Sequence, residues 1–203
     1  MSSFKINHIS KLIRASTELI NCINRTNPNY YNVHRLRSIS FIMKEYFNNN
    51  NYDWCKLVNI NNFNKYGYHK YNIYSSYDDL PNNIKCSLIT WSPGAKTELH
   101  GHPNTSCIMM PINHQIKQNF VPSDVYESLL LPKGINNIYK SQILNPGQTS
   151  YIDDEVGYHS IYNDTDKYIV SLHIYENINT INNIYDIDNI NNMSNHNIKN
   201  TQR

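Results

Sequence analysis

Two stretches near the start of the chain space their apolar residues as an α-helix does. Residues 4–23 carry apolar side chains three or four positions apart, which places them on one stripe of a helix. The stripe consists of Ile6, Ile9, Leu12, Ile13, Leu19, Ile20 and Ile23. A second helix is expected around residues 33–47, before the polar break NNNNYDWCKLV. The pattern therefore predicts a helical region over residues 1–50.

From about residue 68 the pattern changes to short runs rich in β-branched and aromatic residues, which are typical of strands. These runs are YHKYNIYSS, IKCSLITWS, TSCIMMPIN, QIKQNFV, TSYIDD and KYIVSLHIY. Turn-forming residues separate them, in DDLPNN, SPGAK, NPGQT and YNDTDK. Closely spaced strands after a helical third predict a mainly β protein, a sandwich or barrel with the helices packed on it.

The length of 203 residues suits one globular domain with a core of its own. We expect a single domain over residues 1–176, with its β-barrel at about residues 65–176. Residues 177–203 contain ten asparagines among scattered isoleucines, so we expect them to form a poorly packed tail.

Charge and cysteine usage narrow the class of protein. A formal net charge of +2 gives no sign of a nucleic-acid-binding surface. We find neither a leader pattern at the start nor an apolar run of membrane-spanning length. Cys22, Cys55, Cys86 and Cys107 fit neither a zinc motif nor a dense disulfide scaffold. We therefore expect a cytoplasmic protein with reduced thiols and without nucleic-acid or membrane partners.

The stretch ELHGHPNTSC, residues 98–107, holds the first candidate chemistry. On a strand, His100 and His102 would point to the same side, where two imidazoles can share one metal ion. The pair alone is weak evidence, because two packed or surface histidines give the same pattern. Whether the pair binds a metal therefore has to be judged from the sequence around it.

Those surroundings resemble the two signatures of the cupin superfamily. Gly94 precedes His100 by six residues in GAKTELHGH, as in the first signature, and GYHSIYN around His159 is similar to the second. The resemblance implies a double-stranded β-barrel, or jelly roll, with a metal in its mouth. The implied ligands are His100, His102 and His159. Three imidazoles with open positions suit a divalent iron.

Cys107 narrows the resemblance, because most cupins carry a glutamate there. A cysteine at that position, three histidine ligands and a barrel preceded by helices are similar to the animal-type cysteine dioxygenase family. SLHIY resembles that family's Ser-x-His-x-Tyr relay and supplies Ser171, His173 and Tyr175. The order of these motifs makes the resemblance specific over roughly residues 30–176.

A further segment, FNKYGYHK at residues 63–70, resembles the part of those enzymes that closes on the substrate carboxylate. The resemblance implies that Lys70, helped by the Tyr68 hydroxyl, binds the carboxylate. The family has arginine where this chain has Lys70, and a lysine is a point charge without a planar fork. A different thiol substrate is therefore a real alternative.

The resemblance implies an Fe(II)-dependent enzyme that adds both atoms of O2 to the sulfur of free L-cysteine, giving cysteine sulfinic acid. Tyr175, oriented by His173 and Ser171, would act beside the metal as a donor or acid. Cys107 would lie within reach of Tyr175, to which it can be joined by a thioether bond in this family. The family precedent is a monomer.

Two other functions stay open at this point. One is a dioxygenase for another small thiol such as 3-mercaptopropionate, which Lys70 keeps possible. The other is a non-enzymatic metal-binding cupin module. Each residue also has a structural explanation. Cys107 could be a small buried apolar side chain, and alternating Ser171, His173 and Tyr175 would suit any half-buried strand.

Overall fold

The computed structural model describes residues 5–26, 32–49, 52–75, 84–122 and 140–177. Its helices are α1 (Ile9–Thr26), α2 (Asn32–Asn49) and the short 3₁₀ helix η1 (Asp53–Leu57). Its strands are β1 (Tyr68–Ser75), β2 (Ile84–Trp91), β3 (Thr105–Pro111), β4 (Ile116–Val121), β5 (Lys140–Leu144), β6 (Ser150–Ile152), β7 (Tyr158–Tyr162) and β8 (Ile169–Asn177). The predicted tail beyond β8 lies outside the described residues.

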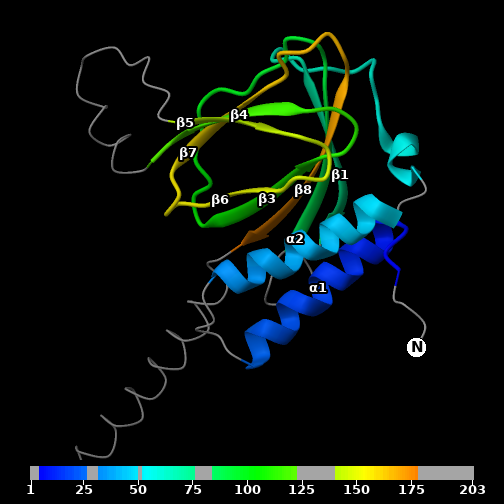
Figure 1. The fold of residues 1–203 in the computed structure, drawn as a ribbon, viewed down its shortest axis with the longest axis vertical. Coiled ribbons are helices and arrows are strands. Elements are labelled where there is room, and N and C mark those ends of the chain that lie inside the picture. Colours follow the sequence, from blue (N-terminus) through cyan, green and yellow to red (C-terminus); the bar gives the residue numbers. More distant parts are fainter. Residues whose placement is uncertain (1–4, 27–31, 50–51, 76–83, 123–139, 178–203) are drawn as a thin grey trace, which may run out of the picture.

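The strands form two antiparallel sheets that face one another (Figure 1). One sheet has five strands in the order β1-β2-β8-β3-β6, and the other has three in the order β5-β4-β7. Apolar side chains from both sheets meet between them, including Ile89, Met109, Ile116 and Ile161. The result is a jelly-roll-like arrangement with a core between two layers.

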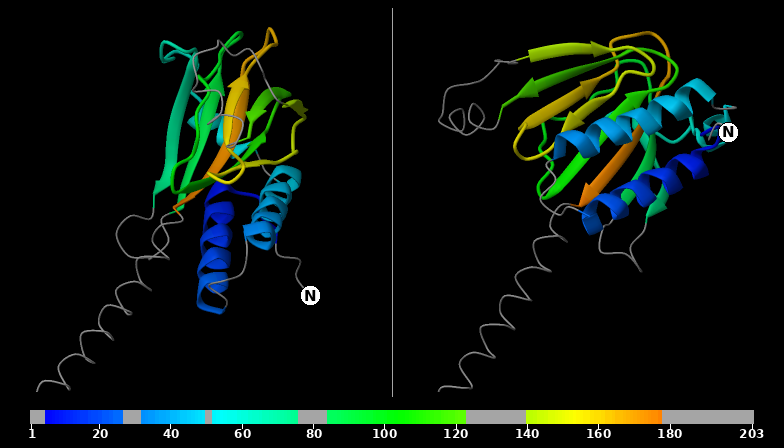
Figure 2. Two further views of the ribbon diagram at one scale, coloured as in Figure 1. Left: turned by 90° about the vertical axis from the view of Figure 1, so that its left-hand side faces the viewer. Right: turned by 60° about the horizontal axis from the view of Figure 1, so that its bottom comes forward.

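The two helices cover the outer face of the five-stranded sheet. Figure 2 shows α1 and α2 lying across the sheet on the side away from β4. Leu88, Ile108 and Leu172 pack with the helices in one buried cluster. Residues next to them in sequence, such as Ile89 and Met109, point into the space between the sheets. Because both faces of β2, β3 and β8 are covered, their residues are buried almost throughout, polar ones included.

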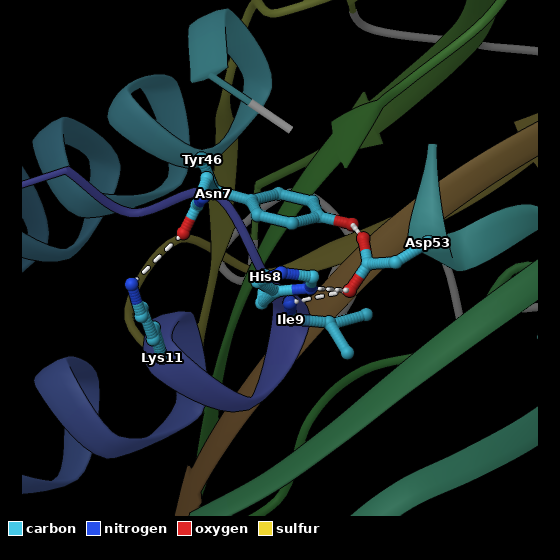
Figure 3. A network of polar contacts seen from close by, with 6 residues as sticks. All are labelled: Asn7, His8, Ile9, Lys11, Tyr46 and Asp53. Carbon is cyan, nitrogen blue, oxygen red and sulfur yellow. Dashed lines mark hydrogen bonds and ion pairs between the residues drawn. The ribbon is translucent and has the colours of Figure 1, made fainter. Parts of the chain in front are cut away.

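A carboxylate from η1 fixes the start of α1 (Figure 3). Asp53 accepts a hydrogen bond from the Ile9 backbone N–H at 2.8 Å and another from the Tyr46 hydroxyl at 2.7 Å. Helix α1 has no acidic residue in its own first turn, so this distant carboxylate supplies the negative charge that a helix start favours. One side chain thereby joins α1, α2 and η1.

The predicted mainly β fold with N-terminal helices packed on it is confirmed. Both helices and six of the eight strands form where the apolar pattern predicts them. Strand β5 was not predicted, because it is half-exposed and has little apolar alternation. Strand β7 was read only as a motif around His159. In the described part of the chain, no helix is long and apolar enough to cross a membrane.

Candidate metal centre and active site

The two histidine-bearing segments lie side by side and hydrogen-bond to each other through their backbones. Gly94 N–H donates to the Asn163 carbonyl at 3.0 Å, and Asn163 N–H donates to the Ala95 carbonyl at 2.9 Å. Further along, His100 and His159 exchange two backbone hydrogen bonds, each of 2.9 Å. The six-residue step from Gly94 to His100 therefore runs beside the four-residue return from Asn163 to His159.

The segment that carries His100 and His102 is not a regular strand. His100 takes part in an isolated β-bridge with His159, and the residues after it form a loop and a turn. Gly101 lies between the two histidines, where an added Cβ would meet the Tyr158 ring at 3.1 Å. A larger residue at position 101 would therefore have to displace the Tyr158 ring or the loop that carries His102.

The three imidazoles converge on one point. Their ligand nitrogens all lie within 4.8 Å of one another. The Nε2 atoms of His102 and His159 are 2.9 Å apart. Two nitrogens that bind one ion at about 2.1 Å and at a right angle are separated by about 3.0 Å. The spacing therefore fits a metal ion held by His100, His102 and His159.

Burial keeps two of the three imidazoles, His102 and His159, uncharged. It lowers the pKa of His102 to about 4, and the nearby His100 and Lys70 lower it further. Burial, with His100 and His102, lowers the pKa of His159 to about 2. A neutral imidazole has a lone pair on one of its two nitrogens, which is what binding of a metal requires.

Hydrogen bonds at the far side of the rings orient two of the ligands. His100 donates its Nδ1–H to the Glu98 carbonyl at 2.9 Å, because a carbonyl can only accept. That bond leaves Nε2 of His100 with a free lone pair. His159 Nδ1 contacts the side-chain amide of Gln118 at 2.7 Å.

The histidines line a cavity of about 280 Å³ between the two sheets. This volume is at or below the lower limit of ordinary small-molecule pockets, which favours a small ligand. Tyr68, Lys70, His173 and Tyr175 also line it. The cavity therefore combines three candidate metal ligands, a lysine and the phenol of Tyr175.

Strand β1 brings Tyr68 and Lys70 to the cavity. The two side chains share one face of the strand, whereas His69 faces a separate surface depression, as expected from strand alternation. Lys70 Nζ lies 4.1 Å from the centre of the Tyr175 ring, which is a cation–π contact. Loss of water and the nearby Lys85 lower the pKa of Lys70.

A row of hydrogen bonds runs along the inner face of β8. Trp91 Nε1–H donates to Ser171 Oγ at 2.8 Å, and Ser171 Oγ lies 2.8 Å from His173 Nε2. Because Ser171 Oγ already accepts from the indole, its own proton is available to His173 Nε2. Neutral His173 then carries its proton on Nδ1, which lies 3.8 Å from Cys107 Sγ.

Cys107 and Tyr175 are directly opposite each other on neighbouring strands β3 and β8. The thiol and the phenol are in hydrogen-bond contact. Burial raises the pKa of Cys107 to about 12 and raises that of Tyr175 well above its usual range. Both groups therefore hold their protons at neutral pH, with His173 beside them.

Comparison with known proteins identifies the family. The model of a family described as cysteine dioxygenase type I matches residues 12–188. The chain belongs to this family.

Several solved structures are similar to this member of the cysteine dioxygenase family. One is the protein TT1209 from Thermus thermophilus, with 12% identity over 61% of this chain and 92% of that chain, at a TM-score of 0.43. An oxalate oxidase has 16% identity over 61% of this chain and 56% of that chain, at a TM-score of 0.45. The cupin domain of a transcriptional regulator from Enterobacter cloacae has 11% identity over 54% and 95%, at a TM-score of 0.39.

In this cysteine dioxygenase family member, the predicted site residues gather around one cavity. Those that line it are Tyr68, Lys70, His100, His102, His159, His173 and Tyr175. Cys107 and Ser171 lie just behind this wall, in contact with Tyr175 and His173. Trp91 and Gln118 carry no signal in the sequence, because their contacts with Ser171 and His159 depend on the pairing of distant strands.

Proposed function

We propose that the protein is an Fe(II)-dependent thiol dioxygenase. It adds both oxygen atoms of O2 to the sulfur of free L-cysteine, so that thiol and O2 together become the sulfinic acid. The observation that carries the proposal is the convergence of three imidazoles in a small cavity that Lys70 and Tyr175 also line. We also propose that it acts as a cytoplasmic monomer.

The proposed ligands are His100, His102 and His159. A set of three neutral imidazoles leaves the whole positive charge of the ion uncompensated. Fe(II) in this place would supply open positions where a thiolate and O2 meet, and its charge would favour the thiolate over the thiol. The histidines themselves contribute geometry and neutrality.

Lys70 is proposed to bind the substrate carboxylate, with the Tyr68 hydroxyl as a second donor. Both side chains come from the same face of β1 and line the cavity with the three histidines. The Tyr175 ring holds Lys70 Nζ at 4.1 Å, which limits where the ammonium can go. A carboxylate bound there would place the thiol end of a small substrate toward the histidines.

Tyr175 is proposed to hold and donate a proton at the reacting end of the cavity. Its burial keeps the phenol protonated, and its ring lies 6.0 Å from that of His102. Ser171 and His173, joined by a hydrogen bond of 2.8 Å, are proposed to orient Tyr175. Proton donation by a positioned side chain is a common source of rate enhancement.

Cys107 is proposed as the partner of Tyr175. It stands where a carboxylate ligand would add negative charge in other cupins, so its presence keeps the site neutral. The direct pairing of the two residues supports a thioether between Cys107 Sγ and the Tyr175 ring, formed with loss of two hydrogens to O2 as oxidant. The intact protein would then be lighter by those two hydrogens.

A second candidate is the same chemistry on another small thiol acid such as 3-mercaptopropionate. The observation in its favour is Lys70, which can bind a carboxylate but cannot form the two-pronged contact of an arginine. A third candidate, a non-enzymatic metal-binding cupin module, requires the same histidines without turnover.

One experiment separates the three candidates. The protein is loaded with Fe(II) without oxygen, and oxygen uptake is then followed with L-cysteine and with 3-mercaptopropionate, the products being identified by mass. Sulfinate from cysteine supports the proposal. Sulfinate from the mercapto-acid alone keeps the reaction and changes the substrate. Bound iron without oxygen uptake on either thiol favours the binding module.

A further inference from the structure

Behind His159 lies a row of three polar side chains that the proposed reaction does not use. Gln118 is completely buried on β4, and its side-chain nitrogen lies 2.7 Å from His159 Nδ1. Its oxygen accepts a hydrogen bond of 3.2 Å from Gln142 on β5. Gln142 also donates to Ser150 Oγ, again at 3.2 Å. The row thus runs from the candidate ligand to β6 in the opposite sheet.

Metal binding depends on which side chain donates and which accepts in each hydrogen bond of this row. A neutral imidazole that binds a metal through Nε2 must carry its proton on Nδ1. In the arrangement seen here, Gln118 donates to Nδ1, so the proton of His159 is on Nε2. That Nε2–H faces the Nε2 atom of His102 at 2.9 Å, which can accept it. This hydrogen-bond pattern suits a metal-free site.

Binding of a metal requires the opposite pattern. The Gln118 carboxamide can meet it by a half-turn that brings Oε1 to the Nδ1–H of His159. Its nitrogen then faces Gln142, whose carboxamide can turn in the same way and accept from both Gln118 and the Ser150 hydroxyl. The His159 Nδ1–H, the Gln118 amide and the Ser150 hydroxyl each have an acceptor after the reversal. The nitrogen of Gln142, a half-buried side chain, turns to the position that its oxygen holds now.

We propose that Gln118 is a positioning residue that accepts the Nδ1–H of His159 in the metal-loaded protein. The row Gln118–Gln142–Ser150 reverses its hydrogen bonds when the metal binds. The inference rests on the proposed function, because it takes His159 to be a metal ligand. A carboxylate at position 118 would accept permanently and add a charge, whereas the carboxamide serves both states and keeps the site neutral.

The direct test follows the protons of the full-length protein by NMR, with ¹⁵N-labelled histidine and Zn(II) as a diamagnetic ion. We expect the proton of His159 on Nε2 without metal and on Nδ1 with Zn(II). Protonation of the same nitrogen in both states would overturn the reversal of the row.

The second test measures Zn(II) and Co(II) affinity by competition with a chelator. We expect Gln118→Leu, which cannot accept, to bind each metal about 10–100-fold more weakly than the wild type. Gln118→Glu, which keeps an acceptor, should stay within about threefold of the wild type or bind more tightly. Asn119→Leu is the matched control, since this neighbouring amide contacts Ser160 and no candidate ligand.

The results of these experiments distinguish a failure of the proposed role of Gln118 from a failure of the proposed function. His102→Ala should abolish tight binding whatever the role of Gln118. If it does, while Gln118→Leu binds as the wild type does, the inference alone is overturned. Equal losses in Gln118→Leu and Gln118→Glu would also overturn it, because they would indicate simple packing. If the wild type binds neither metal, both the inference and the proposed function fail.

Discussion

The two faces of strand β8 have different roles. One packs against the helices and the other lies at the cavity, and alternate residues of one short sequence supply them. Val170, Leu172 and Ile174 point outward and pack under the helices. Ser171, His173 and Tyr175, which alternate with them, are all on the inner face beside the cavity or just behind it. Because side chains alternate across a strand, each residue of one kind has neighbours of the other kind.

The two faces also differ in what a substitution removes. From Val170 to Ile174 the outer face is apolar, so its contribution is burial and close packing. The inner face has polar groups whose hydrogen bonds are satisfied by one another, such as Ser171 with Trp91 and His173. We therefore expect outer-face changes to alter the free energy of unfolding and inner-face changes to alter turnover.

The largest expected effect is on the inner face. Tyr175→Phe should keep the metal and lose turnover by about 100-fold or more, because it removes a proton donor and little volume. The measurements are metal content and oxygen uptake under saturating substrate. Tyr71→Phe is the matched control, since Tyr71 lies on the other face of β1 and is exposed. Full activity of Tyr175→Phe would remove the proposed role.

The next effect belongs to the outer face. Leu172→Ala should lower the free energy of unfolding by about 2–5 kcal/mol, because it leaves a cavity beneath the helices. The turnover of the folded fraction should change by less than about twofold. Denaturant unfolding and activity at low temperature test the two parts.

Leu172→Ala could unfold the protein completely, so a second variant that keeps the volume of the side chain is also needed. Leu172→Met should cost less than about 1.5 kcal/mol and leave activity intact. A large loss of kcat in Leu172→Met, without a loss of stability, would contradict the separation of the two faces.

A smaller effect is expected from Lys70, the inner-face cation of β1. Lys70→Met should raise the KM for L-cysteine by about 10–100-fold, the value of one charge-assisted hydrogen bond. The KM for cysteamine, a thiol without a carboxylate, should change little. Lys70→Arg should bind cysteine at least as well as the wild type. If Lys70→Met raised the KM for both thiols equally, Lys70 would not be the residue that binds the carboxylate.

Much of this arrangement could be predicted from the sequence, because periodicity determines which residues share a face. The alternation in SLHIY put Ser171, His173 and Tyr175 together, and the helical stripe from Ile6 to Ile23 predicted the helix that covers the sheet. The face on which a residue lies can be predicted from the sequence wherever one helix or strand alone determines it.

Contacts between distant elements could not be predicted in this way. The indole of Trp91 meets Ser171, and the amide of Gln118 meets His159, only because of strand pairing. The Asp53 carboxylate that caps α1 is 44 residues away from Ile9 in sequence. The conformation of the loop at His102 could not be predicted for a similar reason, since Gly101 packs there against Tyr158, 57 residues away in sequence.

The smallest expected effect is a pH dependence of stability that comes from the inner face alone. Burial lowers the pKa of His173 well below its usual value near 6.5. Between that lowered pKa and about 6.5, the unfolded chain binds more protons than the folded one. Stability is therefore complete above about pH 7 and falls as the pH drops from 6.5 toward 5.

A comparison of metal-free wild type with His173→Asn isolates this contribution. Between pH 7.5 and 5, the wild type should lose about 1–2 kcal/mol more in the free energy of unfolding than the variant does. His102 and His159 titrate in both proteins, so their shared contribution cancels in the difference. Leu172→Met, next to His173 but on the outer face, should keep the full pH dependence of the wild type. If His173→Asn and wild type show the same slope, His173 is already protonated or already solvated in the native protein. The inner face of β8 would then be less secluded from water than its packing indicates.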